Sequence, residues 1–119
     1  MTEQYQVHIT RYAYKQMKEI RQYIEHELLS PDAAKALLVS IRKVVSNLAF
    51  MPAKYQLVEE EPWHTEGVRR VIVRNFLVYY FIDEEKKKVY VTAVVYGKRE
   101  QLKQLVDMKM GDDDVIFSK

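Results

Sequence analysis

Two stretches with apolar residues at helical spacing, separated by a short break, constrain the fold of this chain most. Over residues 11–28, apolar side chains recur every three or four positions, which places them on one face of a helix. The segment SPDAA (30–34) then carries a helix start signal, and a second apolar stripe runs to Leu48, ahead of Pro52. Because so few residues join the two stretches, the sequence predicts an antiparallel helical hairpin.

Strand patterns surround this hairpin. A short alternating stretch precedes it at residues 5–10, and three further strands are predicted at 68–73, 76–83 and 88–96. The stretch FLVYYFID is apolar on both faces, as a central strand should be. With a short C-terminal helix over 98–110, the order β-α-α-β-β-β-α predicts an α+β fold. In this fold, the N-terminal strand joins a mostly antiparallel four-stranded sheet, and the helical hairpin packs on one face of that sheet.

Composition limits the classes of protein to which the chain can belong. Its 119 residues fit a single domain, which we expect over 1–110, followed by an acidic, flexible tail over 111–119. The absence of cysteine excludes a disulfide framework and thiolate metal sites. No signal peptide pattern is present and no apolar run reaches the roughly 18 residues of a membrane helix, so we expect a cytoplasmic protein without a membrane partner.

Cationic residues gather at the ends of two predicted strands. In VRRVIVRN, alternation sends Arg69 and Arg70 to opposite faces, and Arg74 falls on the side of Arg70 if the strand is regular. Lys98 and Arg99 follow a strand that we expect to lie beside this one. Arginine forks match phosphate oxygens, so these cations are candidates for a phosphate site. The alternative is that they are solvated charges that pair with the acidic loop ahead of the strand.

Two other side chains are candidates for proton transfer. His64 lies in a predicted loop, and a histidine side chain is able to take or give a proton. Tyr96 directly precedes the basic turn. The neighbouring Trp63 is able to stack on a base, although a tryptophan in such a loop more often closes the edge of the core. The acidic run 59–61 lacks further ligands at metal spacing, and no phosphate-binding glycine loop occurs. We therefore expect neither a metal nor a cofactor.

Four stretches, in this order, resemble the RelE/ParE superfamily of bacterial toxins from type II toxin–antitoxin systems. They are IRQYIEHELLSPDAA, LAFMPAKY, GVRRVIVRNFLVYYFID and VYVTAVVYGKRE, and they extend over most of residues 5–100. The resemblance implies a toxin with a cognate antitoxin encoded beside it. It also implies one of two activities. RelE-like members cleave mRNA on the ribosome, without a metal, by attack of the 2′-hydroxyl, whereas ParE-like members poison DNA gyrase.

Ribosome-dependent mRNA cleavage is the first hypothesis for this chain, and the resemblance supplies its site. The arginine of GKRE matches a phosphate-binding arginine of the RelE-like branch, and a strand arginine is also expected, without the alignment deciding which one. The expected catalytic residues are Arg99, Arg70, Tyr96 and His64, and the expected RNA-binding residues are Arg69, Arg74 and Lys98. A tyrosine that the RelE-like branch carries after the basic turn falls near Leu105 here, so Tyr96 or His64 would have to replace it.

Two alternatives stand beside the nuclease. SPDAA and MPAKY look closer to ParE-like members, which favours a non-enzymatic gyrase poison. The other alternative is an inactive, protein-binding relic of the fold. In all three cases the expected partner is a cognate antitoxin, joined by the ribosome and its mRNA, or by gyrase, if the toxin is active.

Overall fold

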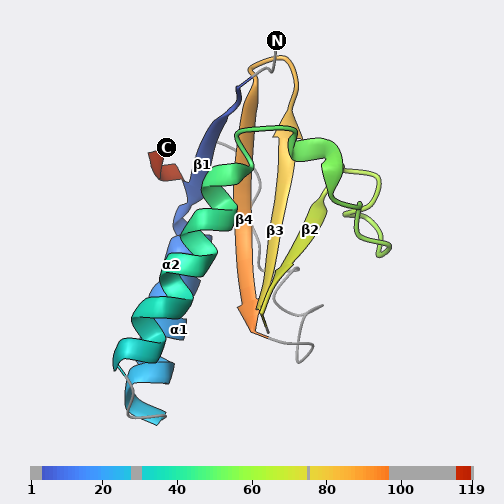
Figure 1. Ribbon diagram of the computed structural model, residues 1–119. Helices are drawn as coiled ribbons and strands as arrows, with labels where there is room; N and C mark the ends of the chain where they lie inside the picture. Colours follow the sequence, from blue (N-terminus) through green and yellow to red (C-terminus); the bar gives the residue numbers. More distant parts are fainter. Residues whose placement is uncertain (1–3, 28–30, 75, 97–114, 119) are drawn as a thin grey trace.

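The chain forms a helical hairpin against a twisted sheet (Figure 1), and this computed structural model describes residues 4–27, 31–74, 76–96 and 115–118. The elements are β1 (Gln6–Thr10), α1 (Arg11–Glu27), α2 (Pro31–Asn47), the 3-10 helix η1 (Pro52–Lys54), β2 (Arg69–Val73), β3 (Phe76–Asp83), β4 (Lys88–Tyr96) and β5 (Val115–Ser118). The expected α+β fold is confirmed in its order of elements. The helix expected over 98–110 lies outside the described residues.

The sheet has five strands in the order β2-β3-β4-β1-β5, one more than the sequence predicted. β1 pairs with β4 in parallel, and the other three pairings are antiparallel. The additional strand comes from the segment expected to be a flexible tail: Val115–Ser118 pairs with β1, with Ser118 opposite His8. This pairing gives the edge of β1 a hydrogen-bonded neighbour.

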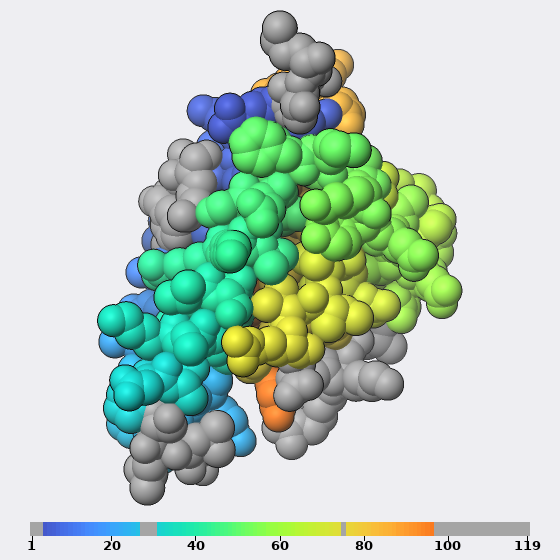
Figure 2. All heavy atoms as spheres, in the orientation of Figure 1, coloured from blue at the N-terminus to red at the C-terminus, as the bar shows by residue number. Residues whose placement is uncertain are grey.

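The main core lies between the hairpin and one face of the sheet. Ile41, Val45 and Leu48 are 0% exposed, and they pack with residues of α1 and with alternate residues of the strands. The space-filling view shows α2 and the segment that follows it covering most of β4 from this side (Figure 2). Burial of these apolar side chains, at roughly 25 cal/mol per Å², is the main force that holds the hairpin in place.

A hydrogen bond next to a bulge in β4 connects α1 to the sheet. Tyr79 pairs with Ala93 and Tyr80 with Val91, so the register shifts by one residue between them. Just beyond the bulge, the Val94 N–H donates to Oε1 of the buried Gln16 at 2.7 Å. A buried backbone N–H needs a partner, and here a helix side chain provides it.

A second, smaller core lies on the opposite face of the sheet. It contains Val58, Val68, Leu77, Tyr79, Ala93 and Val95. Trp63 packs against it from the loop between η1 and β2. The tryptophan therefore closes the edge of the core, as the simpler of its two interpretations anticipated.

Candidate functional site

Arg69 is engaged by the backbone of the preceding turn. Its Nη1 donates to the carbonyl oxygens of Tyr55 at 2.6 Å and Ala53 at 3.3 Å. On the neighbouring strand, the hydroxyl of Tyr80 donates to the carbonyl of Pro52. Both side chains therefore fasten the 52–55 turn to the sheet, and the arginine fork is directed at main-chain oxygens.

Arg70 lies on the other face of the sheet, as strand alternation predicts. It pairs across the strands with Tyr79, and its guanidinium hydrogen-bonds the Tyr79 hydroxyl. Burial raises the pKa of Tyr79, and the hydrogen bond and charge of Arg70 act in the opposite direction. Arg70 is thus a half-buried cation whose fork has a partner inside the protein.

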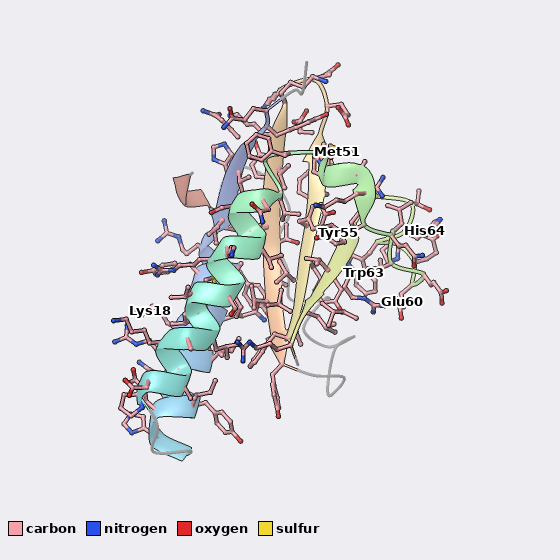
Figure 3. The ribbon with its side chains drawn as sticks, viewed as in Figure 1. Lys18, Met51, Tyr55, Glu60, Trp63 and His64 are labelled. Atoms are coloured by element: carbon pink, nitrogen blue, oxygen red, sulfur yellow. The ribbon has the colours of Figure 1, made fainter. Side chains whose placement is uncertain are left out.

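A shallow groove of about 420 Å³ runs along the outer edge of β2. Its walls are Lys54, Tyr55, Gln56, Leu57, Glu59, Glu60, Arg70, Val71 and Ile72. Two cations and two carboxylates therefore share the groove, and their formal charges cancel. A polyanion gains little from such a surface, because its attraction to Lys54 and Arg70 is offset by repulsion from the glutamates. Figure 3 shows Tyr55 and Glu60 on this side of the molecule.

Arg74 lies on the side of the helices, which corrects the expectation that it shares a face with Arg70. Its Nη2 is 3.5 Å from Oγ of Ser40, on α2. The reason is local: Arg74 has φ 56°, in the left-handed region, where β2 turns into β3. Strand alternation ends at that turn, and the rule for side-chain direction ends with it.

The two candidates for proton transfer occupy separate places. His64 lies in the loop beyond edge strand β2, and its Nδ1 is 2.7 Å from the Val58 carbonyl, to which it donates (Figure 3). Tyr96 is the last residue of β4. Its ring centroid lies 5.0 Å from that of Phe76 and 6.4 Å from that of Tyr23. Strand β3 lies between β2 and β4, so the two groups do not meet at one point.

Among the predicted site residues that the structure describes, the side chains do not gather around one point. Arg69 binds the 52–55 turn, Arg70 faces the opposite side, and Arg74 reaches α2. Lys98 and Arg99 lie outside the described residues. Sequence reasoning missed the structural pairing of Arg69 with Tyr80. The available signal was the hairpin itself, in which RRV (69–71) stands opposite VYY (78–80).

Arg69→Met is expected to lower the free energy of unfolding by about 1–3 kcal/mol, because it removes the hydrogen bonds of a charged donor, one of them a part-buried contact to the Tyr55 carbonyl. Methionine keeps much of the apolar stem, so the change isolates the hydrogen bonds. The matched control is Arg74→Met, with an expected change within about 0.5 kcal/mol, because Arg74 is exposed and makes one long contact. Urea denaturation of the three proteins measures both values. Equal effects would show that Arg69 has no special structural role.

The described residues contain neither a metal cluster nor a membrane-spanning helix. No group of three histidine, aspartate or glutamate side chains there is placed to hold a metal ion. Likewise, within the described ranges no helix has the length and hydropathy needed to cross a membrane.

A family model and a solved structure resemble this chain. A family model described as "ParE toxin of type II toxin-antitoxin system, parDE" matches residues 7–101. A solved structure described as "Chromosomal ParDE TA system from P. aeruginosa" aligns with a TM-score of 0.66 at 17% identity, covering 81% of this chain and 99% of that chain; at such identity the likeness shows the fold. No curated protein matches the chain. Because the family match extends over most of its length, the chain belongs to the ParE family of toxins from type II toxin–antitoxin systems.

Proposed function

We propose that this protein acts as a non-enzymatic poison of DNA gyrase and is neutralised by a cognate antitoxin in the cytoplasm. Membership of the ParE family supports placing the gyrase poison ahead of the mRNA nuclease. The observation that carries it is the dispersal of the described arginines: each fork is directed to a different part of the fold. The mRNA nuclease thereby becomes the second hypothesis.

Chemistry explains why dispersal weighs against the nuclease. Metal-independent cleavage of RNA requires a base within hydrogen-bond reach of the 2′-hydroxyl, and cations around the same phosphate. Hydrogen-bond reach is about 3 Å, so the groups have to surround one point. Arg69 and Arg70 lie on opposite faces of one strand, and His64 and Tyr96 lie on different sides of β3. A protein that only binds its target has no such requirement.

The decisive experiment compares two targets at the same toxin concentrations. With gyrase, ATP and supercoiled plasmid, we expect linear DNA to accumulate after treatment with detergent and protease, because a trapped cleavage complex is revealed in that way. With translating ribosomes we expect intact mRNA. Cut mRNA without trapped gyrase would contradict the proposal and restore the nuclease hypothesis.

The antitoxin provides the control for both reactions. We expect a short reading frame beside this one to encode it, and we expect the two proteins to purify together. Adding the antitoxin should abolish trapping of gyrase, and washing it away in denaturant should restore trapping once the toxin has refolded. If growth is unaffected by the toxin alone, the relic alternative is supported and both active forms are excluded.

A further inference from the structure

A row of cations runs along the outer side of α1. Arg11, Lys15 and Lys18, here called the α1 stripe, stand four and three residues apart and are exposed. At about 100° per residue, these positions fall within an arc of roughly 60°. The buried side chains of the same helix, among them Ala13, Met17 and Ile24, occupy the opposite side. The stripe therefore faces away from the core, as Lys18 does in Figure 3.

The charges of the α1 stripe are not used within the described part of the chain. None of the three cations forms an ion pair or a side-chain hydrogen bond with a described residue. One turn further on, Arg21 is different, because its Nε binds Oε1 of Glu25 at 3.0 Å. Glu19 borders the stripe without such a contact to Lys15. The stripe thus presents three positive charges to the solvent.

Shallow depressions follow the α1 stripe along the helix. One of about 390 Å³ is lined by Arg11, Tyr14, Lys15, Lys18, Glu19 and Gln22. The next, of about 290 Å³, shares Lys18 and Gln22 with the first and continues to His26. All three cations line the first depression, and the second extends this open surface along the helix, so the surface suits an elongated ligand.

An acidic cluster lies away from the α1 stripe, although Glu19 and Glu25 stand on the same helix as the stripe. The loop between η1 and β2 carries Glu59, Glu60, Glu61 and Glu66, beyond the edge strand β2. α1 instead packs on β4 and, to a lesser extent, on β1. In Figure 3, Lys18 and Glu60 lie on opposite sides of the molecule. A polyanion would approach the protein on the side of the α1 stripe, because the stripe attracts it and the acidic loop repels it.

We propose that the α1 stripe binds the phosphate backbone of duplex DNA and so holds the toxin on the DNA that gyrase is cutting. This inference rests on the proposed function. The three cations are spaced by about 6 and 4.5 Å along the helix axis. Duplex DNA carries one charge per about 1.7 Å of its own axis, so a row with this spacing meets phosphates in many orientations.

The surroundings of the α1 stripe favour duplex DNA over single-stranded RNA. Binding of single strands relies on aromatic rings on which the bases stack. The aromatic residue beside the stripe, Tyr14, is half-buried, and the exposed Tyr23 projects from a different side of α1. Contacts to phosphates alone suit a paired backbone whose bases are already stacked.

Binding of a labelled duplex of about 20 base pairs, followed by fluorescence anisotropy, tests the proposal without gyrase. Three phosphate contacts predict a slope of about −2.7 in log affinity against log salt, or about a 40-fold loss between about 50 and 200 mM salt. The variant Arg11→Gln/Lys15→Gln/Lys18→Gln should lose at least about tenfold in affinity at low salt, and most of the slope. Glutamine is a good helix former, so α1 should remain folded, which circular dichroism checks.

The matched control removes the same charge from the other helix of the hairpin. Lys35, Arg42 and Lys43 are exposed on α2, and replacing all three by glutamine changes the net charge equally. This variant should retain the wild-type affinity within about twofold, because its cations lie outside the stripe. A second variant, Arg11→Lys/Lys15→Arg/Lys18→Arg, keeps the charges of the stripe and should bind as the wild type does.

Each outcome decides for or against the α1 stripe. Equal losses in the α1 and α2 variants would overturn the proposal, because they would show that only the net charge of the protein matters. Tighter binding to single-stranded RNA than to duplex DNA would also overturn it, because the ligand would then be a different nucleic acid. Wild-type protein that traps gyrase but does not bind the duplex would overturn this inference alone. Wild-type protein that binds the duplex through the stripe but does not trap gyrase would overturn the proposed function alone.

Discussion

Replacing Ile41 by alanine is expected to lower the free energy of unfolding by about 2–5 kcal/mol. Ile41 is 0% exposed and lies on α2, where the hairpin packs on the sheet. The change removes buried methyl and methylene groups and leaves a cavity that the surrounding helices and strands fill only in part. Since domains of this size are stable by about 5–15 kcal/mol, the loss is a large fraction of the total.

The control for Ile41→Ala lies two residues away on the same helix. Val39 is 57% exposed, so Val39→Ala removes little buried surface, and alanine favours a helix more than valine does. Its effect should stay within about 0.5 kcal/mol. Guanidinium denaturation of the three proteins gives the midpoints and the slopes. If both variants unfold at the same denaturant concentration, Ile41 does not hold the hairpin to the sheet.

The sequence predicted those elements whose signals are local. Both helices begin where the pattern placed them, at Arg11 and Pro31, and β3 and β4 have the predicted bounds. The helices carry a long apolar stripe at helical spacing, and both strands are long apolar runs, rich in β-branched and aromatic residues, between turn signals. β5 was missed because four residues after an acidic run carry too little pattern. Its pairing with β1 joins residues about a hundred positions apart, which no local rule reports.

The candidate site was harder to predict, for a similar reason. Alternation correctly separated Arg69 from Arg70, because it depends only on the strand. It failed at Arg74, where the backbone leaves the strand with a positive φ. The partners of Arg69 are carbonyl oxygens 14 and 16 residues earlier in the chain, and nothing in the pattern of VRRVIVR indicates them. Composition alone does not distinguish a structural arginine from one that binds phosphate.

The MPAKY stretch connects the fold to the choice of activity. This stretch resembles ParE-like members more closely than RelE-like ones, and its carbonyl oxygens accept hydrogen bonds from Arg69 and Tyr80. An arginine engaged in this way is not available to a scissile phosphate without loss of the turn. The same contacts that shape the edge of the sheet therefore weaken the nuclease hypothesis and leave binding as the simpler activity.

Alkaline pH is expected to destabilise the protein steeply above about pH 10, because two tyrosines are buried in the sheet. Burial raises the pKa of Tyr80 above its ordinary value, and the charge of Arg69 only partly opposes this. Burial likewise raises the pKa of Tyr79, against the influence of Arg70. The unfolded chain releases both protons near pH 10, whereas the folded chain retains them. This contribution to stability is therefore complete below about pH 10 and is lost as the pH rises towards the folded pKa values.

The size of this pH effect follows from the number of protons involved. Each retained proton lowers the free energy of unfolding by about 1.4 kcal/mol per pH unit, so the two tyrosines together give up to about 2.7 kcal/mol per unit. Urea midpoints measured from about pH 9 to 11 provide the slope. The other ionisable groups of the chain supply a background that is common to all variants.

Phenylalanine variants separate the buried tyrosines from that background. Tyr80→Phe should remove about half of the tyrosine slope, although it also costs about 1 kcal/mol at neutral pH through loss of the bond to Pro52. Tyr79→Phe/Tyr80→Phe should leave only the background. An unchanged slope in the double variant would mean that neither hydroxyl stays protonated in the folded sheet. The packing of both rings against the arginine-bearing strand β2 would then need revision, and with it the structural role assigned to Arg69.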